Sequence, residues 1–322
     1  MSATPPPSPP DGTTGPLLTR CTFPPPGVPL DCGVSGGPDS LALLVLAVAA
    51  GCRVTAVHVD HGLRTGSAAE AEVVAAAAAR FGAAFRSVRA PVADGPNLEA
   101  RARRARHGAL GPDAATGHTA DDQAETVLVN LLRGAGVEGL AAMRRGPRHP
   151  LLGLRRVETA ALCRALGLVP VQDPSNTDPR FLRNRVRAEL LPRCSELAGR
   201  DVVPVLARQA DLLAGDADLL AAVAELVDPA DARALAAAPE PAARRAVRRW
   251  LQGDGPYAPP AAAVARVVAV ARGEHRATEV PGGRRVSRSG GRLEVSGPSA
   301  GTGDGPVDGR PVQSARGHDG RG

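Results

Sequence analysis

Between residues 28 and 132 the spacing of apolar positions changes repeatedly, from short strand-like runs to the wider period of helices. Strand-like runs at 28–34, 53–59, 83–88 and 113–117 alternate with helix-like runs at 41–50, 68–81, 97–110 and 120–132. The run at 53–59 is β-branched and suits a pleated strand, whereas the alanine-rich run at 68–81 suits a helix. This alternation predicts an α/β fold, a doubly wound parallel sheet.

The strand signal fades after about residue 154. Helix-like runs follow at 155–166, 179–191, 202–227, 242–252 and 261–272, and residues 278–295 read as short strands joined by Gly-Gly turns. We therefore expect a catalytic domain over 28–200. A smaller, mainly helical domain with a terminal β-hairpin should follow over 201–296.

The two ends of the chain lack a core-forming pattern. Residues 1–27 are rich in Pro, Thr and Gly and predict a disordered lead, with at most a short helical turn near residues 17–21. Residues 297–322 predict a disordered tail. The longest apolar run, Leu41–Ala50, is half the length of a membrane span, and the N-terminus has no signal-like apolar stretch. We therefore expect a cytoplasmic protein with no membrane partner.

The 322-residue chain carries its 39 basic side chains entirely as arginine, against 33 acidic residues. The absence of lysine excludes Schiff-base and pyridoxal phosphate chemistry, a Walker A loop and a protein-kinase site in their usual forms. Five cysteines without a CxxC pair argue against structural zinc and iron–sulfur sites and fit a reducing compartment. A net charge of +6 favours phosphate or nucleic-acid partners, although it is also ordinary for this length.

The strongest local motif follows the first predicted strand and opens an apolar helix. It consists of Ser35, Gly36, Gly37, Pro38, Asp39 and Ser40. The glycines permit a tight turn whose N–H groups face an anion, and the start of the helix adds partial positive charge. Pro38 suits the first helical position, and Asp39 suits a metal that bridges phosphates. The alternative interpretation is a plain helix N-cap.

Four further stretches place polar side chains at the ends of strands or on one face of a helix. Asp60, between His58 and His61, ends the second strand, where a doubly wound sheet binds its ligands. Arg101 and Arg104 share a helical face, as do Asp122 and Glu125 after His118. The carboxylate pair could bind a metal or a substrate ammonium. A solvated basic face and a capped helix start are the alternatives.

The last of these stretches, residues 172–187, holds a turn followed by a basic helix. Arg183 and Arg187 are four residues apart and project from one face, which fits a phosphodiester backbone. A basic surface helix is the alternative interpretation.

The motif at 35–40 resembles the PP-loop of the N-type ATP pyrophosphatases. Together, SGGPDS, HVDHGLR, NLEARARRARH, HTADDQAETVLVNLLRGAG, HPLL and DPSNTDPRFLRNRVRAELLP resemble the tRNA(Ile)-lysidine synthetase family in that superfamily. The resemblance implies a ligase that adenylates O2 of the wobble cytidine of a CAU-anticodon isoleucine tRNA, using ATP and Mg²⁺. L-lysine then attacks that carbon and AMP leaves.

By matching position, the resemblance implies that residues 35–40 hold the ATP phosphates, with Asp39 also on the metal. Asp39, Asp122, Glu125 and His118 would be catalytic. Candidates for ATP contacts are Asp60, Arg101, Arg104 and Arg133, and candidates for tRNA or the adenylate are Arg183, Asn184 and Arg187. His107 and Thr119 depart from the family pattern. A homodimer, another PP-loop ligase and a non-catalytic RNA-binding scaffold are left open.

Overall fold

In the computed structural model the described residues are 11–60, 67–91, 101, 105, 108–171, 178–253, 255 and 258–297. The chain divides into two compact units, Met1–Ala217 and Asp218–Gly322. The division falls inside the long helix α10 (Val203–Glu225). Each unit is described by itself below.

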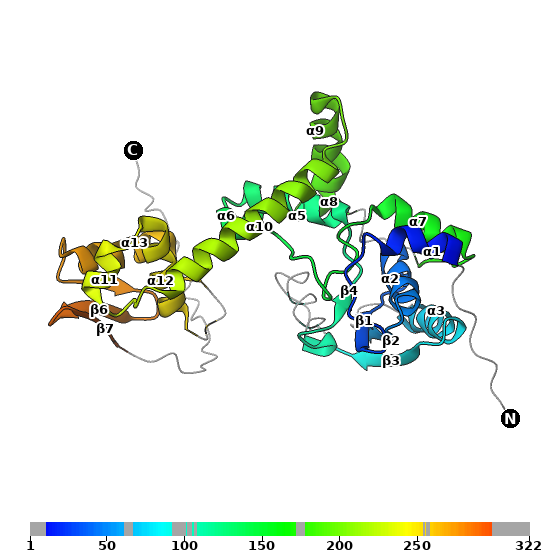
Figure 1. Cartoon of the computed structure of the whole chain (residues 1–322), viewed down its shortest axis with the longest axis horizontal. Helices are drawn as coiled ribbons and strands as arrows, with labels where there is room; N and C mark the ends of the chain where they lie inside the picture. The colour runs from blue at the N-terminus through cyan, green and yellow to red at the C-terminus, as the bar shows by residue number, and fades with distance from the viewer. Residues whose placement is uncertain are drawn as a thin grey trace, which may run out of the picture. The chain divides into compact units, whose positions relative to one another are not determined.

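The first unit is built on a four-stranded parallel sheet (Figure 1). Its strands are β1 (Pro29–Gly33), β2 (Arg53–Asp60), β3 (Ala84–Arg89) and β4 (Ala115–Thr116), in the order β3-β2-β1-β4. The predicted parallel α/β fold is therefore confirmed. Pro29 is tolerated in a central strand because it is the first residue of β1, and β4 pairs only with Cys32 and Gly33.

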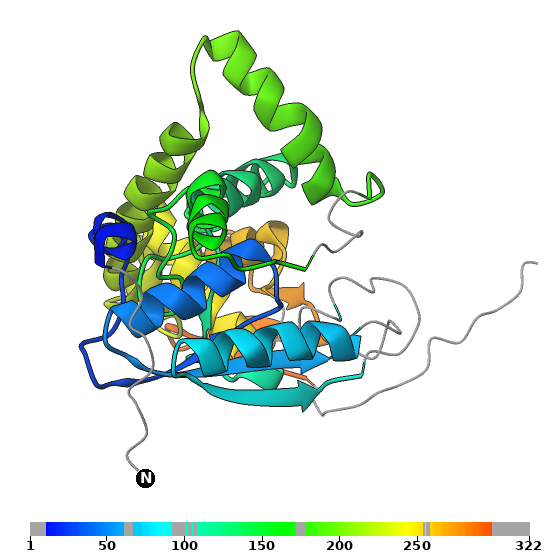
Figure 2. The same cartoon turned by 90° about the vertical axis from the view of Figure 1, so that its right-hand side faces the viewer.

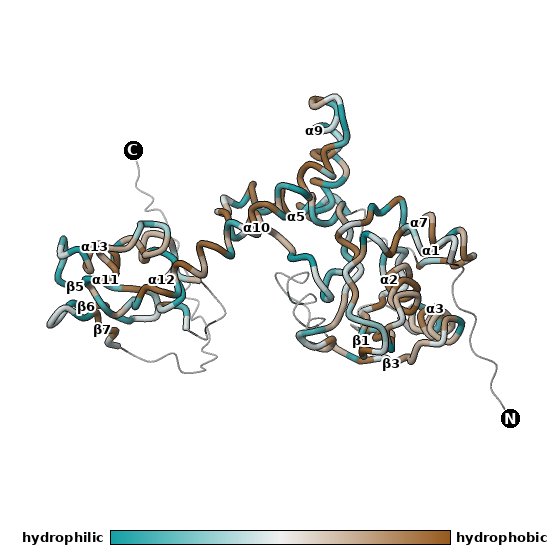
Figure 3. The backbone as a smooth tube through the Cα atoms, viewed as in Figure 1, coloured by the Kyte–Doolittle hydropathy of each residue, from teal (hydrophilic) through white to brown (hydrophobic). Residues whose placement is uncertain are grey.

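Helices α2 (Pro38–Ala49) and α3 (Ser67–Arg80) lie side by side on one face of this sheet (Figure 2). Every residue from Ser40 to Ala47 is buried, and the α2 tube is accordingly brown in Figure 3. Helix α7 (Arg156–Ala165) packs against α2 and adds Leu162 and Cys163 to the main core. A helix that is apolar all round must be covered on all sides, so α2 anchors this core.

A helical cluster follows the sheet. It comprises α5 (Ala120–Leu132), α6 (Val137–Leu140), α8 (Leu182–Arg185), a π-helical turn (Val186–Leu190) and α9 (Leu191–Ala198). The sequence pattern predicted one helix over residues 179–191. In the structure, α8, the π-helical turn and α9 follow one another from Leu182 to Ala198, so the helical segment ends later than predicted. Pro192 cannot donate a backbone hydrogen bond, and the Leu191 N–H reaches back to the Val186 carbonyl.

The first turns of α10 belong to the same unit. Val203 and Ala207 pack in a cluster with Ala124, Leu128 and Val186. The compact units therefore divide after Ala217, whereas the sequence pattern placed the end of the catalytic domain near residue 200.

The second unit contains α11 (Ala232–Ala237), α12 (Glu240–Gln252), α13 (Ala261–Arg272), β5 (Ala277–Val280), β6 (Arg284–Ser289) and β7 (Arg292–Ser296). The three strands form an antiparallel sheet in sequence order. Positive φ angles at Gly282, Gly283, Gly290 and Gly291 make the two tight turns that the Gly-Gly pairs predicted.

The predicted disordered lead is wrong for residues 11–27. Helix α1 (Asp11–Leu18) is followed by an irregular segment whose Cys21 and Phe23, with Leu17 and Leu18, pack against the main core. The Thr22 N–H donates to the Pro150 carbonyl at 3.1 Å. A few apolar side chains at irregular spacing suffice to anchor a Pro-rich segment, and periodicity cannot detect them. Residues 1–10 and 298–322, which include most of the predicted tail, lie outside the described residues.

The expectation that the chain has no membrane span can be compared with the helices of the structure. Within the described ranges, no helix is both long enough and apolar enough to cross a bilayer.

Candidate active site

The loop between β1 and α2 folds back on itself. Gly36 has φ +86°, a left-handed conformation that glycine adopts without strain. The Ser35 N–H donates to Ser40 Oγ at 3.2 Å, and Ser40 Oγ donates to the Gly37 carbonyl at 2.9 Å. Gly117 faces the loop so closely that a Cβ there would lie 2.6 Å from the Asp39 carbonyl oxygen. The loop is thus fixed both from within and by the segment after β4.

The start of α2 is not an ordinary capped helix end. Gly37 occupies the N-cap position with no side-chain hydrogen bond to the first turn. The unsatisfied N–H groups of a helix start attract anions, together with the helix dipole. The plain N-cap interpretation is therefore not what forms here, and the geometry suits phosphate oxygens.

Helix α5 begins with a capping box. Thr119 is the N-cap residue, and its N–H and Oγ1 both donate to Asp122 Oδ2 at 2.9 Å. This leaves Asp122 Oδ1 facing the interior of the site. Capping and site chemistry were alternatives in the sequence, but the two oxygens of Asp122 divide these roles between them.

One guanidinium connects the loop at residues 35–40, which we call the phosphate loop, with α5. At the first residue of α7, Arg156 places Nε 3.4 Å from Asp39 Oδ2 and Nη2 2.9 Å from Asp122 Oδ1. Its Nη1 lies 3.0 Å from Glu125 Oε1. Thr159, one turn later, donates its hydroxyl hydrogen bond to Asp39 Oδ1. Arg156 is therefore the hub of the site.

Glu125 is fully buried and binds two further arginines. Arg183 Nε lies 2.8 Å from Oε2, while Arg187 Nε and Nη2 lie 2.6 and 3.0 Å from Oε1 and Oε2. Arg187 belongs to the π-helical turn, a distortion common at functional sites. Three guanidinium groups thus balance three carboxylates, which we call the carboxylate–arginine cluster: Asp39, Asp122, Glu125, Arg156, Arg183 and Arg187.

The two aspartates of the cluster titrate in opposite directions. Burial raises the pKa of Asp39 above its ordinary value, despite the hydrogen bonds from Thr159 and Arg156. Burial would also raise the pKa of Asp122, but the charges of Arg156, His118 and Arg183 outweigh it and lower that pKa. The site therefore favours the charged form of Asp122, whereas burial disfavours the charged form of Asp39.

Other polar residues of the α5 motif have structural partners. Asp121 binds Arg155 through both oxygens, at 3.0 and 3.1 Å, and accepts the Arg156 N–H at 2.8 Å. Gln123 is buried and exchanges two hydrogen bonds with the Met143 backbone, at 2.8 and 3.0 Å. These contacts hold α5 and the start of α7 in place.

His118 lies beside the cluster, as the sequence suggested. Its Nδ1 is 2.8 Å from Thr116 Oγ1, which is also 2.9 Å from His149 Nδ1. The two imidazole rings meet edge to face with centroids 5.2 Å apart. Sequence reasoning missed His149, although it belongs to the quoted HPLL run.

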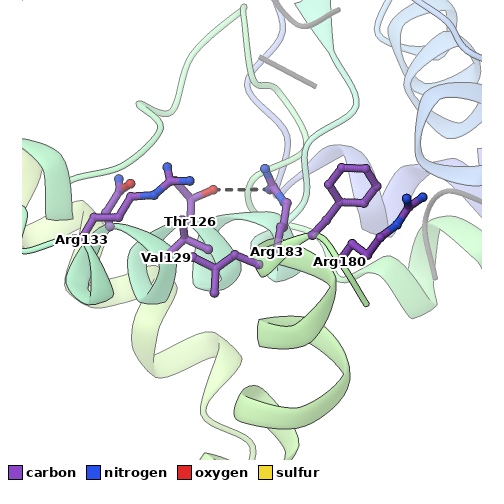
Figure 4. A pocket seen from close by; sticks show the side chains of 8 residues that line it. Thr126, Val129, Arg133, Arg180 and Arg183 are labelled. Atoms are coloured by element: carbon purple, nitrogen blue, oxygen red, sulfur yellow. Dashed lines mark hydrogen bonds between the residues drawn. The ribbon is translucent and has the colours of Figure 1, made fainter. Parts of the chain in front are cut away.

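The remaining predicted ATP contacts are less fully assembled. Asp60 ends β2 and is half-buried. Arg101 has buried Nε and Nη2 atoms without a hydrogen-bond partner in the described part of the chain, and Arg104 lies outside it. Arg133, at the end of α5, shares a pocket with Arg183 (Figure 4).

The basic helix at 182–187 turns toward the site. Arg183 and Arg187 bind Glu125, so the alternative of a merely solvated surface helix does not hold for them. Asn184 Nδ2 donates to the Asp178 carbonyl at 2.9 Å. Asn184 therefore secures the turn that leads into this helix.

Sequence reasoning also missed Arg156 and Thr159. The only signal was Arg155-Arg156 after HPLL at the start of a helix. No spacing rule relates these residues to Asp39, because the contact depends on how α7 packs against α2.

Two domain families match separate parts of the chain. A PP-loop domain family (ATP_bind_3) matches residues 27–194, and a TilS substrate binding domain matches residues 231–294. The chain belongs to the tRNA(Ile)-lysidine synthase family. All six residues of the carboxylate–arginine cluster fall within the PP-loop match.

Relatives in this family match over most of the chain. The tRNA(Ile)-lysidine synthase of Mycolicibacterium paratuberculosis is 49% identical over 69% of this chain and 74% of its own. That of Cutibacterium acnes is 42% identical over 82% of this chain and 87% of its own. Among solved structures, the U34-tRNA thiolase NcsA from Methanococcus maripaludis aligns with TM-score 0.50 at 17% identity, covering 63% of this chain and 80% of its own. This last likeness concerns the fold alone.

The opposite titration of the two aspartates predicts opposite effects of neutral substitutions. Because the pKa of Asp39 is raised in the folded protein, its contribution to the free energy of unfolding is present at low pH. That contribution is lost as pH rises through the raised pKa. At pH 7, Asp39→Asn should therefore unfold at or above the wild-type temperature. The lowered pKa of Asp122 means that its share is present at neutral pH and lost as pH falls.

Asp122→Asn should therefore unfold about 2–4 °C below wild type at pH 7, through weaker charge pairing and capping. The difference in unfolding temperature between Asp122→Asn and wild type should become smaller toward pH 3. Thermal melts monitored by circular dichroism measure this difference. Asp31→Asn is the control, because its exposed pair with Arg86 contributes little. An Asp122→Asn variant as stable as wild type at pH 7 would contradict the assignment.

Proposed function

We propose that this chain is an ATP-dependent tRNA(Ile)-lysidine synthase. It joins L-lysine to C2 of the wobble cytidine in isoleucine tRNA with a CAU anticodon. The cytidine O2 attacks the α-phosphate of ATP and releases pyrophosphate; the amine of lysine then attacks C2 and AMP leaves. Family membership supports the reaction. The observation that carries it is Arg156, which holds the phosphate-loop Asp39 against Asp122 and Glu125.

The phosphate loop is the site for the ATP phosphates. The uncapped start of α2 offers backbone N–H groups, and Ser35 and Ser40 offer hydroxyl groups. Arg101 supports this assignment, because a buried guanidinium without a partner in the described residues suits a polyanion. Asp60 and Arg104 remain sequence-based candidates for the same substrate.

Mg²⁺ fits this site only together with ATP. In the described ranges, no group of three or more His, Cys, Asp or Glu side chains gathers to hold a metal. Mg²⁺ commonly uses one or two carboxylates together with substrate phosphates, and Asp39 at the loop provides such a ligand. When bound, Mg²⁺ would neutralise charge on the phosphates.

Asp122 and Glu125 are the residues suited to a substrate ammonium. Asp122 stays ionised because its pKa is lowered, which favours holding a cation over storing a proton. The attacking amine must lose its proton before it bonds to C2. His118, beside Asp122, is our candidate for the acceptor, because a neutral imidazole can take up a proton and pass it on. Once protonated, the same ring adds to the positive charges that lower the pKa of Asp122.

The carboxylate–arginine cluster implies an order of binding. The three arginines occupy the oxygens that a lysine ammonium would need. Guanidinium groups also bind phosphate strongly, so the triphosphate can draw them away from the carboxylates. Arg183 and Arg187 would then face the adenylate or tRNA. We therefore propose that ATP binds before lysine.

Lysidine formation tests the proposed function directly. Purified protein with ATP, radiolabelled lysine and an isoleucine tRNA transcript with a CAU anticodon should incorporate one lysine and release one AMP per tRNA. The matched control is the same transcript with uridine at the wobble position, which should accept no lysine. Asp39→Asn should lower turnover at least a hundredfold while remaining folded. If neither transcript accepts lysine although the tRNA is correctly folded, the proposal is wrong.

The binding order makes a second prediction. Isothermal titration should detect little lysine binding to the free protein, and at least about tenfold tighter binding with a non-hydrolysable ATP analogue. Arg187→Gln, which removes one competitor from Glu125, should bind lysine more tightly than wild type without nucleotide. Equal lysine affinity with and without the analogue would refute the order and leave the reaction itself untouched.

A further inference from the structure

A hollow of about 260 Å³ adjoins the carboxylate–arginine cluster. One wall is a single face of α5, formed by Thr126, Val129, Asn130 and Arg133 at positions i, i+3, i+4 and i+7. The other wall is the turn of residues 180–183 at the start of α8 (Figure 4). We call this hollow the α5 pocket.

The α5 pocket is joined to the site through Arg183. This side chain lines the pocket, donates to Thr126 Oγ1 at 3.4 Å, and binds Glu125 through Nε at 2.8 Å. A ligand in the pocket would therefore lie next to the reacting groups, on the side where α5 continues away from Asp122.

The pocket is lined by three guanidinium groups. Arg183 is engaged by Glu125, and Arg180 pairs with Asp178 while remaining 84% exposed. Arg133 is exposed and makes no ion pair with any described residue. Among the described residues that line the pocket, none is acidic. This charge repels the ammonium groups of lysine and favours an anionic ligand.

Phe181 adds a stacking surface to this basic pocket. The chain has only six aromatic residues. In the first unit, Phe23 packs against the core and Phe81 is 4% exposed, so neither is open to a ligand. Phe85 is exposed but lies on β3 and does not line the pocket. Phe181 is half-buried and lines the α5 pocket. An aromatic ring combined with arginines is typical of sites for unpaired nucleotides.

We propose that the α5 pocket binds an unpaired nucleotide of the RNA substrate, adjacent to the reacting cytidine. The base stacks on Phe181, and Arg133 and Arg180 bind the flanking phosphates. This assignment rests on the proposed function for the identity of the RNA. ATP is a poorer occupant, because its phosphates have their own site at the uncapped start of α2. The proposal thus assigns Arg133 to the RNA in place of the ATP contact that the sequence suggested.

Binding of a fluorescent anticodon stem–loop with a CAU anticodon tests the pocket, by anisotropy on the full chain at several salt concentrations. Phe181→Leu keeps an apolar side chain but removes the ring, and should raise Kd at least about fivefold. Phe181→Tyr keeps an aromatic ring and should bind the stem–loop with an affinity close to that of wild type. Phe85→Leu, an exposed ring on β3 outside the pocket, is the matched control and should bind as wild type does.

The arginine is tested by the salt dependence. Arg133→Gln should weaken binding and reduce the slope of log K against log salt by about one, whereas Phe181→Leu should leave the slope unchanged. Arg164→Gln, an exposed arginine on α7, should alter neither quantity. In turnover assays, the KM for tRNA should rise in both pocket variants while the KM values for ATP and lysine stay constant.

Wild-type affinity in Phe181→Leu, or an unchanged salt slope in Arg133→Gln, would overturn the nucleotide assignment. Increased KM values for ATP or lysine would also count against it. The two proposals fail separately. A protein that binds the stem–loop through Phe181 but forms no lysidine would lose the proposed function and keep the pocket, and the reverse result would lose only the pocket.

Discussion

A carboxylate without solvent contact must be compensated, and Glu125 is the point on which this catalytic unit depends. Moving an unpaired carboxylate from water into a protein interior costs several kcal/mol. Glu125 is fully buried and accepts four hydrogen bonds from three guanidinium groups. These arginines come from the start of α7, from α8 and from the π-helical turn. The need to neutralise one side chain thus brings together segments that are distant in the sequence.

Arginine suits this task better than lysine would. A planar guanidinium donates in several directions at once, and Arg156 uses this property to reach Asp39, Asp122 and Glu125 together. The phosphate loop relies on backbone N–H groups and serine hydroxyls, so the absence of lysine from the chain removes nothing from it. The N-terminal segment contributes indirectly. Arg20 pairs with Glu158, which also accepts the Arg155 N–H at the start of α7.

Much of this organisation could be predicted from the sequence, because it is local. The bounds of α5 and α13 follow from apolar periodicity and breakers, and the phosphate loop follows from two glycines before an apolar helix. Asp122 and Glu125 were found because helical spacing relates them. Arg156, Thr159 and the packing of residues 11–27 escaped, because these contacts depend on long-range packing. The sequence also could not decide whether Asp122 caps α5 or serves the site. The structure shows that it does both, with one carboxylate oxygen for each role.

The central claim is that a single forked cation at position 156 joins the phosphate loop to the carboxylates of α5. Replacing it by lysine tests this most directly, because Arg156→Lys keeps the charge and removes the fork, and would be the only lysine in the chain. The account predicts that lysidine-forming turnover of Arg156→Lys falls by about a hundredfold or more, as far as that of Arg156→Ala, in a protein that remains folded. Turnover of Arg156→Lys within about tenfold of wild type would contradict it, because a point charge would then suffice.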